Sequence, residues 1–381
     1  MKTGIMSMQR VNNYGSFMQA LSLKTILEEL GHEVVFVDFK AKPSIQHRRS
    51  FHYWIDRAKS LIRETRLYWI IANIVRRRQI GYRIPKPVLS ENQAFIQALE
   101  ELGVDNEHPH YHTKVDALII GSDEVFNCLQ NTDNVGYSLE LFGKNNRARI
   151  LLSYAASFGN TTLERLEQYG VQRQIGRYLD KFDAISVRDE NSAQIVRKLT
   201  GKEPFQHLDP ALIGGIEKMN WKENDEKNYI ALYAYSNRIS KEEGEQISSF
   251  ANGRGLRVLI INGVQKNCSF ETIKNRDPKE IIPYVRNANM LITDTFHGTI
   301  FSIINHIPFA VYCRKPQDVS YSNSEKLLDL LKKFDLTDRL ISESNDLDTV
   351  FSRRIDFEKL DMIRAKERAE TIQYFKNALS Q

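Results

Sequence analysis

Residues 290–313 read MLITDTFHGTIFSIINHIPFAVYC, and they decide how the rest of the chain is interpreted. The apolar run 290–293 is typical of a buried strand, two polar residues interrupt it, and the apolar side chains of 299–305 suit a packed helix. His297 stands in the turn between them. In open α/β sheets, ligands bind beyond the carboxyl ends of strands, where helix N-termini offer N–H groups to anions. His297 is therefore either a ligand-binding residue or a side chain that caps or packs under the helix, and this stretch favours neither.

The beginning of the chain repeats the alternation of strand and helix. Residues 2–7 and 32–39 are predicted strands, and the helical spacing of 17–30 lies between them. This order predicts a parallel sheet. The turn 10–15 lacks GxGxxG, so it does not support a dinucleotide site. Its asparagines and Gly15 either bind a ligand or form a plain turn.

Three further strands end in polar loops. They are residues 115–120, 150–154 and 183–187, followed by loops that carry Asp123, Ser157 and Arg188. A helix is predicted around 163–179, between the second and third of these strands. Because the carboxyl ends of parallel strands share one edge of a sheet, we expect the three side chains on one rim.

Two of these residues have alternative roles. The guanidinium of Arg188 either grips a carboxylate or phosphate in a bidentate manner, or pairs with Asp189 or Glu190 beside it. Asp123, which follows Gly121 and Ser122, is either a general base or a helix N-cap.

Length and composition predict two domains. The chain has 381 residues, of which 41% are hydrophobic and 27% charged, as in ordinary soluble globular proteins. The polar stretch 214–227 reads as a linker before a second alternating set of strands and helices. We expect an N-terminal α/β domain over 1–213, a C-terminal α/β domain over 228–354 and a closing helix within 355–381. Two Rossmann-like halves with a cleft between them follow from this pattern.

The positive charge is concentrated in one segment. Residues 40–86 hold 13 Lys or Arg against two acids, with aromatic and aliphatic residues at helical spacing. A basic helical insertion over about 44–86 is predicted, which either packs on its own domain or contacts an anionic membrane surface. Nucleic acid binding is not expected, because no recognised motif accompanies the charge.

We expect a cytoplasmic protein, with the basic segment at the inner face of the plasma membrane. The N-terminus lacks a signal-peptide pattern, and the longest apolar segment, 67–75, is far shorter than the roughly 20 residues that span a bilayer. Cys128, Cys268 and Cys313 have no zinc-type spacing, so no metal is expected.

The motifs together resemble the polysaccharide pyruvyl transferase family. They are NNYGSFMQALSLKTILEELGHEVVFVDF, GSDEVFN, SYAASFG, SVRDENSAQIVRKLTG, LDPALI and ITDTFHGTIFSIINHIPFAVY, in order along nearly the whole chain. The resemblance implies two Rossmann-like α/β domains in a glycosyltransferase-B-like arrangement. It also implies an enzyme that transfers the pyruvyl group of phosphoenolpyruvate to sugar hydroxyls of a glycan or lipid-linked oligosaccharide, with no cofactor besides this donor.

The resemblance assigns the catalytic roles to His297, Asp123 and Arg188. Histidine is the residue type whose ordinary pKa lies nearest neutral, which suits an acid that protonates the donor's methylene carbon. Arg188 would hold the donor's anionic groups, and Asp123 would orient or deprotonate the acceptor. The predicted substrate-binding residues are Asn13, Tyr14, Gly15, Gly121, Ser122, Ser157, Thr295, Phe296, Gly298, Arg314 and Lys315.

Two positions depart from the family's pattern. Thr295 stands where many members carry arginine, and Phe126 where tryptophan is frequent. Two alternatives therefore stay open: a nucleotide-sugar-dependent glycosyltransferase of the same architecture, and a non-catalytic component of polysaccharide assembly. The sequence itself lacks a nucleophile elbow, HExxH and a Walker loop, so hydrolase, metalloprotease and kinase functions are disfavoured.

Overall fold

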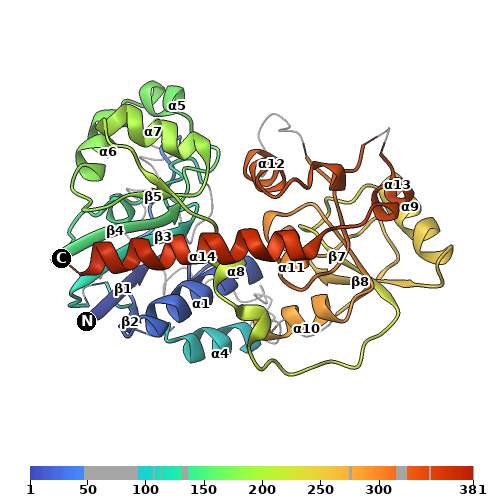
Figure 1. Ribbon diagram of the computed structural model, residues 1–381. Helices are drawn as coiled ribbons and strands as arrows, with labels where there is room; N and C mark the ends of the chain where they lie inside the picture. Colours follow the sequence, from blue (N-terminus) through green and yellow to red (C-terminus); the bar gives the residue numbers. More distant parts are fainter. Residues whose placement is uncertain are drawn as a thin grey trace, which may run out of the picture.

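The computed structural model contains two parallel sheets. It describes residues 1–46, 93–105, 108–111, 113–130, 136–273, 277–314, 324–342 and 345–380. The first sheet has the order β2-β1-β3-β4-β5-β6 and the second β11-β10-β7-β8-β9, and neighbouring strands in both are parallel (Figure 1). The prediction of two Rossmann-like α/β domains is confirmed.

The first domain carries the six-stranded sheet. Strands β3 and β4 are buried along their whole length, as expected for a parallel sheet covered on both faces. The chain passes from β1 to β2 on one side and to β3 on the other, so the topological switch point lies between β1 and β3. The strands are β1 Lys2–Met6, β2 Glu33–Phe36, β3 Ala117–Asp123, β4 Ile150–Ala156, β5 Ser186–Val187 and β6 Phe205–Gln206.

The helices of this domain follow the strands in the expected order. Residues 163–179 form two helices instead of the single predicted one, because Gly170 has a φ of 67°, outside the helical region. The helices are α1 Tyr14–Glu29, α4 Gln93–Leu102, α5 Leu163–Gln168, α6 Gln172–Leu179, α7 Glu190–Thr200 and α8 Pro210–Ile213, with short 3₁₀ turns η2 Leu139–Phe142 and η3 Ile216–Lys218.

The second domain carries the five-stranded sheet. Its strands are β7 Tyr229–Tyr233, β8 Arg257–Asn262, β9 Glu271–Thr272, β10 Met290–Thr293 and β11 Phe309–Val311. Its helices are α9 Lys241–Asn252, α10 Ile281–Arg286, α11 Phe296–Ile304, α12 Ser324–Lys333 and α13 Leu347–Ser352, with 3₁₀ turns η4 Pro278–Glu280 and η5 Thr337–Arg339. Residues 290–313 thus form β10, α11 and β11, and they lie on the side of the second domain that faces the first.

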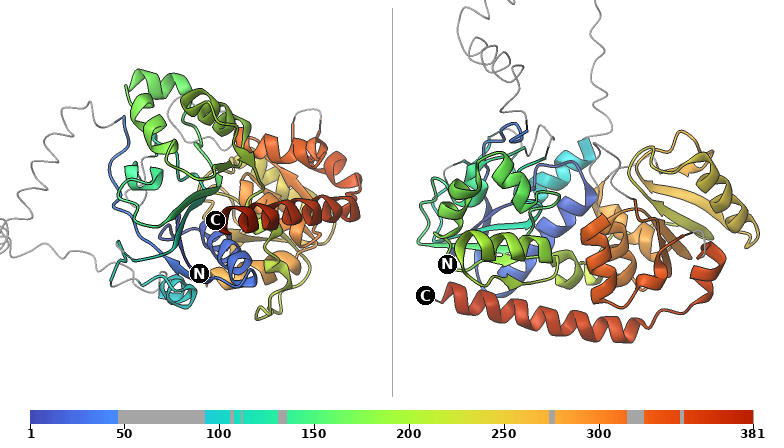
Figure 2. Two further views of the ribbon diagram at one scale, coloured as in Figure 1. Left: turned by 60° about the vertical axis from the view of Figure 1, so that its left-hand side comes forward. Right: turned by 90° about the horizontal axis from the view of Figure 1, so that it is seen from above.

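The last helix, α14 Phe357–Leu379, returns from the second domain to the first. It runs along both domains, and its C-terminal end lies near the N-terminus of the chain (Figures 1 and 2). The Tyr374 hydroxyl donates to the Ser153 carbonyl at 2.7 Å, and the Phe375 ring packs on Tyr154. The helix leaves the second domain and packs on the first, so it joins the two domains. The two parallel α/β domains, with a cleft lined by residues of both, have the predicted glycosyltransferase-B-like arrangement.

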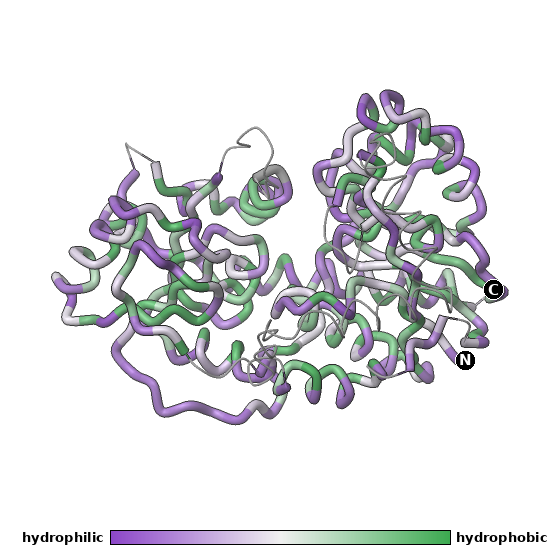
Figure 3. Tube along the Cα trace, turned by 180° about the vertical axis from the view of Figure 1, so that it is seen from behind, coloured by the Kyte–Doolittle hydropathy of each residue, from purple (hydrophilic) through white to green (hydrophobic). Residues whose placement is uncertain are grey.

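Hydrophobic residues follow the strands into the interior of each domain, while the outer turns of the helices are mostly hydrophilic (Figure 3). Within the described ranges, no helix is both long enough and apolar enough to cross a membrane. Most of the predicted basic insertion falls in residues 47–92, outside the described part of the chain, so this insertion stays a prediction.

Candidate functional site

Arg188 joins two carboxylates that come from distant parts of the first domain. It follows β5, and its Nη2 lies 3.3 Å from Oδ1 of Asp123 at the end of β3. Its Nη1 lies 2.6 Å from Oδ2 of Asp209, the N-cap of α8. Asp209 caps this helix because its other oxygen accepts the Ala211 N–H and Pro210 fills the first helical position. The predicted alternative of an ion pair between Arg188 and its neighbours is wrong.

The opposite charges in this cluster keep one another ionised despite burial. Burial alone would lower the pKa of Arg188, but Asp123 and Asp209 outweigh it and hold this pKa above its ordinary value. Burial would likewise raise the pKa of the Asp209 carboxyl, but His297 and Arg188 lower it to about 2. Asp209 and Arg188 are therefore both charged at neutral pH.

Asp123 is fixed from two sides. Besides its contact with Arg188, its Oδ2 accepts a hydrogen bond from the Ser16 hydroxyl of α1 at 3.3 Å. Its φ of 76° lies in the left-handed region, which aspartate tolerates better than most residues. No helix begins in the described residues that follow it, 124–130, so the helix-cap alternative is wrong.

His297 lies in the first turn of α11 and faces the first domain. Its Nε2 is 3.7 Å from Oδ2 of Asp209, and among the described residues this buried nitrogen has no hydrogen-bond partner. The first turn of α1 lies against the other side of the ring, since a Cβ added to Gly15 would come within 2.0 Å of Nδ1. The cap of α11 is Thr295, whose hydroxyl accepts the Gly298 N–H at 2.9 Å. His297 is therefore not the cap, and its Nε2 is a buried nitrogen without a hydrogen-bond partner among the described residues.

Phe296 lies between two cations from different domains. The Arg188 guanidinium is 4.6 Å from the centre of its ring and the Lys326 ammonium 5.3 Å, both within cation–π range. Lys326, on α12, also lies 2.7 Å from Oε1 of Glu124 in the first domain. Burial by itself would lower the pKa of Lys326, but Glu124 raises it above its ordinary value. This lysine is charged, and its ion pair crosses the cleft.

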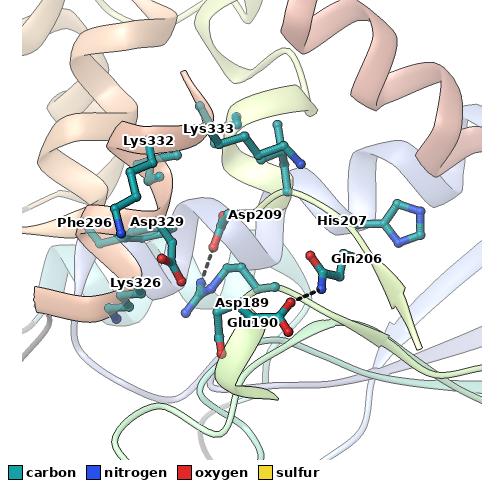
Figure 4. A pocket seen from close by; sticks show the side chains of 14 residues that line it. Asp189, Glu190, Gln206, His207, Asp209, Phe296, Lys326, Asp329, Lys332 and Lys333 are labelled. Atoms are coloured by element: carbon teal, nitrogen blue, oxygen red, sulfur yellow. Dashed lines mark hydrogen bonds and ion pairs between the residues drawn. The ribbon is translucent and has the colours of Figure 1, made fainter. Parts of the chain in front are cut away.

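Next to these residues is a cavity of about 220 Å³, which we call the charged cavity. Figure 4 shows lysines and Asp329 of α12 on one side of it and residues of the first domain on the other. Its lining contains four acids and four Lys or Arg. The lining residues are Arg188, Asp189, Glu190, Gln206, His207, Leu208, Asp209, Leu212, Phe296, Lys326, Asp329, Leu330, Lys332 and Lys333.

A second cavity, of about 200 Å³, lies between the first turn of α1 and the second domain. We call it the neutral cavity, because none of the described residues that line it is charged. Asn12, Asn13 and Tyr14 line it from the first domain, and Tyr235, Ser236, Ile260, Ile261, Asn262, Gly263, Thr272 and Ile273 line it from the second.

The remaining predicted residues differ in how close they come to the cavities. Asn13 and Tyr14 line the neutral cavity, whereas Ser157 is buried and donates to Asp189 at 2.6 Å. The Ser122 hydroxyl donates to the side chain of Gln19 in α1. Gly121 passes close to the backbone of β4, because a Cβ added to Gly121 would come within 2.2 Å of the Tyr154 carbonyl oxygen. The two serines and Gly121 therefore contact other protein groups and are not among the described residues that line the two cavities.

Arg314, the first of the two predicted cations after β11, is not among the residues that line the charged cavity. Arg314 makes two contacts with Glu243, at 2.5 and 3.0 Å, and its Nε is 3.9 Å from Asp294. Lys315 lies outside the described residues. Phe126 is buried in an aromatic cluster, with its ring 4.9 Å from Phe142 in a stacked arrangement, and therefore belongs to the core.

Sequence reasoning missed Asp209, Glu124 and Lys326. Asp209 had a signal, since Asp-Pro is typical of a helix start and this one follows a strand. Lys326 had none, because it stands in a charged helix where any of its lysines fits a solvated face. Within the described part of the chain, no group of three or more His, Cys, Asp or Glu is placed to hold a metal ion.

Comparison with known proteins gave one family and several distant structures. A family model described as polysaccharide pyruvyl transferase matches residues 13–312, and a search of curated proteins gave no match. Among solved structures, S. aureus MnaA with UDP is 13% identical, with 100% of this chain and 98% of that chain covered and a TM-score of 0.46. An alpha-glucosyltransferase in complex with UDP is 11% identical, with coverages of 99% and 96% and a TM-score of 0.44. Spinosyn rhamnosyltransferase SpnG is 11% identical, with 100% of both chains covered and a TM-score of 0.44.

Proposed function

The chain belongs to the polysaccharide pyruvyl transferase family, which makes it a transferase that modifies polysaccharides, and we propose that it transfers the pyruvyl group of phosphoenolpyruvate. The acceptor in this proposal is a pair of hydroxyls on a glycan or a lipid-linked oligosaccharide. The matched residues include Asp123, Arg188, Asp209 and His297, and Lys326 lies beyond them.

The observation that carries the proposal is a pair of buried nitrogens, one on Arg188, which lines the charged cavity, and one on His297, which lies 3.7 Å from the lining residue Asp209. Within the described residues, Nε of Arg188 and Nε2 of His297 have no hydrogen-bond partner. Buried polar atoms in proteins nearly always have partners, so such atoms in a cleft are candidates for ligand contacts. An anionic oxygen of the donor would accept a hydrogen bond from Nε of Arg188, and the methylene carbon of the donor would receive the proton of Nε2 of His297. Because carboxylates already hold the two terminal nitrogens of Arg188, its guanidinium is fixed in place before the donor binds.

Lys326 offers a second cation for the same donor. Phosphoenolpyruvate carries a carboxylate and a phosphate, and Arg188 and Lys326 flank Phe296 from opposite domains. We propose that Lys326 takes the place of the arginine that many family members carry where this chain has Thr295. In the absence of donor, Glu124 balances its charge.

The proposed reaction begins with proton transfer from Nε2 of His297 to the methylene carbon of the donor. Positive charge develops at the central carbon, and an acceptor hydroxyl oxygen bonds to that carbon while Asp123 receives or orients its proton. A second hydroxyl then displaces the phosphate and closes a cyclic ketal. One hydroxyl proton has in effect become part of the new methyl group, the other leaves with inorganic phosphate, and no redox change occurs.

The test is incubation with phosphoenolpyruvate and candidate glycans. The proposal predicts release of inorganic phosphate together with a pyruvate-sized mass gain on the glycan, and loss of both with His297→Gln. Protection of the protein by nucleoside diphosphates, with no binding of phosphoenolpyruvate, would instead support a nucleotide-sugar-dependent glycosyltransferase.

We also propose that the basic segment 40–86 brings the enzyme to anionic membranes. The support is its composition, since clusters of Lys and Arg near apolar residues are attracted to anionic lipid. Flotation with vesicles that contain phosphatidylglycerol tests this, and absence of binding at low salt rejects it.

A further inference from the structure

The neutral cavity has the chemistry of a sugar site. Its lining contains the amides of Asn12, Asn13 and Asn262 and the hydroxyls of Ser236 and Thr272. Two tyrosines and three isoleucines complete it. Amides and hydroxyls both donate and accept hydrogen bonds, as sugar hydroxyls do. Tyrosine adds an apolar ring face with a polar end, which matches the mixed surface of a sugar ring. The volume lies below the roughly 300–1,000 Å³ of sites for drug-sized ligands, so it suits one sugar ring.

Two of the amides are fixed by the protein itself. The side-chain oxygen of Asn13 accepts the Gly15 N–H at 2.7 Å and the Ser16 N–H at 3.3 Å. The side-chain nitrogen of Asn262 donates to the Ala234 carbonyl at 3.1 Å. These bonds set the plane of each amide before a ligand arrives, which reduces the entropy lost on binding.

His297 is not among the described residues that line either cavity, but residues close to it line each of them. Asn13 and Tyr14 line the neutral cavity, and the next residue, Gly15, lies directly against the His297 ring. Asp209 and Phe296, which line the charged cavity, lie on the other side of His297. The first turn of α1 thus lies between a ligand in the neutral cavity and the proposed acid.

We propose that the neutral cavity is an acceptor subsite that binds an uncharged sugar ring. The role as acceptor rests on the proposed function, but the binding of sugar does not require the donor. A nucleoside diphosphate fits this cavity less well, because its phosphates need cations and the described lining supplies none.

The experiment measures binding of separate probes by ligand-observed NMR. The probes are methyl β-galactopyranoside and methyl α-glucopyranoside as uncharged sugars, glucuronic acid as a charged sugar, uridine diphosphate and phosphoenolpyruvate. Thr272→Trp fills the cavity from the edge strand β9, and Glu271→Trp is the matched control, since neighbouring strand residues point to opposite faces.

At least one uncharged sugar should bind saturably, and Thr272→Trp should weaken it about tenfold or more while phosphoenolpyruvate affinity changes less than about twofold. Glu271→Trp should leave both unchanged. No saturable binding of either uncharged sugar, equal weakening by both variants, or displacement of the sugar by phosphoenolpyruvate would overturn the proposal. If the sugar binds as expected and phosphoenolpyruvate does not bind, the donor assignment fails and the subsite stands.

Discussion

The two cavities beside His297 have similar volumes and opposite chemistry. The charged cavity is lined by four acids and four Lys or Arg, and the neutral cavity by amides, hydroxyls and apolar side chains. Both lie at the carboxyl ends of parallel strands, where the two domains meet. The difference indicates that one cleft separates two tasks: the charged cavity handles an anionic donor, and the neutral cavity handles an acceptor without charge.

The buried charges of the charged cavity make the stability of the fold sensitive to changes there. Burial of Arg188 is tolerable only because Asp123 and Asp209 compensate its charge, and each of these partners depends on the others. The neutral cavity contains no such interdependence among its described lining residues. Changes in the charged cavity should therefore affect stability and catalysis together, whereas a change at the edge of the neutral cavity, such as Thr272→Trp, should affect acceptor binding more than stability.

Arg188→Ala should have the largest effect. It leaves two buried carboxylates without their counter-charge, which costs about 3–5 kcal/mol in the free energy of unfolding. Loss of a preorganised cation should also lower kcat by about 10²–10³-fold. Urea denaturation and phosphate release measure the two effects. Arg197→Ala, on an exposed ion pair with Glu190 and Glu203, should change stability far less, and an equal cost for both variants would contradict the assignment.

Gly15→Ala should displace the ring of His297. The new methyl group would meet the His297 ring at 2.0 Å, so the ring must move, and a displacement of about 1 Å can cost about 10²-fold in rate. Gly253→Ala is the control, because its methyl group would meet the Ser249 carbonyl oxygen at an ordinary 3.5 Å. Steady-state kinetics should show lower kcat for Gly15→Ala alone. Unchanged kcat would mean that the position of His297 is not important for the reaction.

Acid should weaken the charged cavity specifically through Asp209. Its pKa of about 2 lies below the ordinary 3.8, so its contribution is fully present above about pH 4 and is lost as the pH falls towards 2. The difference between the pKa of Asp209 in the folded protein and in the unfolded chain corresponds to about 2–3 kcal/mol. Urea denaturation of the wild type and Asp209→Asn across this range measures the contribution. The stability difference between them should shrink as the pH falls, and a constant difference would refute the charge assignment.

Thr295→Ala should have the smallest effect. Its hydroxyl caps α11, so its loss should cost about 1 kcal/mol of stability. The KM for phosphoenolpyruvate should change less than about threefold in Thr295→Ala, and Thr295→Ser should restore the stability. A large rise in KM without loss of stability would make Thr295 a donor contact, as predicted from the sequence.

The strands that position the site were predictable, and the shortest elements were not. The apolar runs at β1, β3, β4 and β10 have four to seven residues, a length typical of buried strands bounded by turn residues. Strands β6 and β9 have two residues each, too few to give a pattern.

The site itself was predictable only where strand ends determine it. Asp123, Arg188 and His297 follow strands, and the structure brings Arg188 to Asp123 and, through Asp209, to His297. Lys326 and Glu124 meet across 202 residues of sequence, a pairing that no local pattern contains. Arg314 was predicted on the same strand-end rule, but Glu243, which also completes the capping box of α9, holds it away from the charged cavity.

The most direct test of the two-cavity account is a crystal structure with phosphoenolpyruvate and an uncharged methyl glycoside bound together. We expect the donor in the charged cavity, with an anionic oxygen on Nε of Arg188 and its methylene carbon next to Nε2 of His297, and the sugar in the neutral cavity. Phosphoenolpyruvate in the neutral cavity, or in the charged cavity without contact to Arg188 and His297, would contradict it.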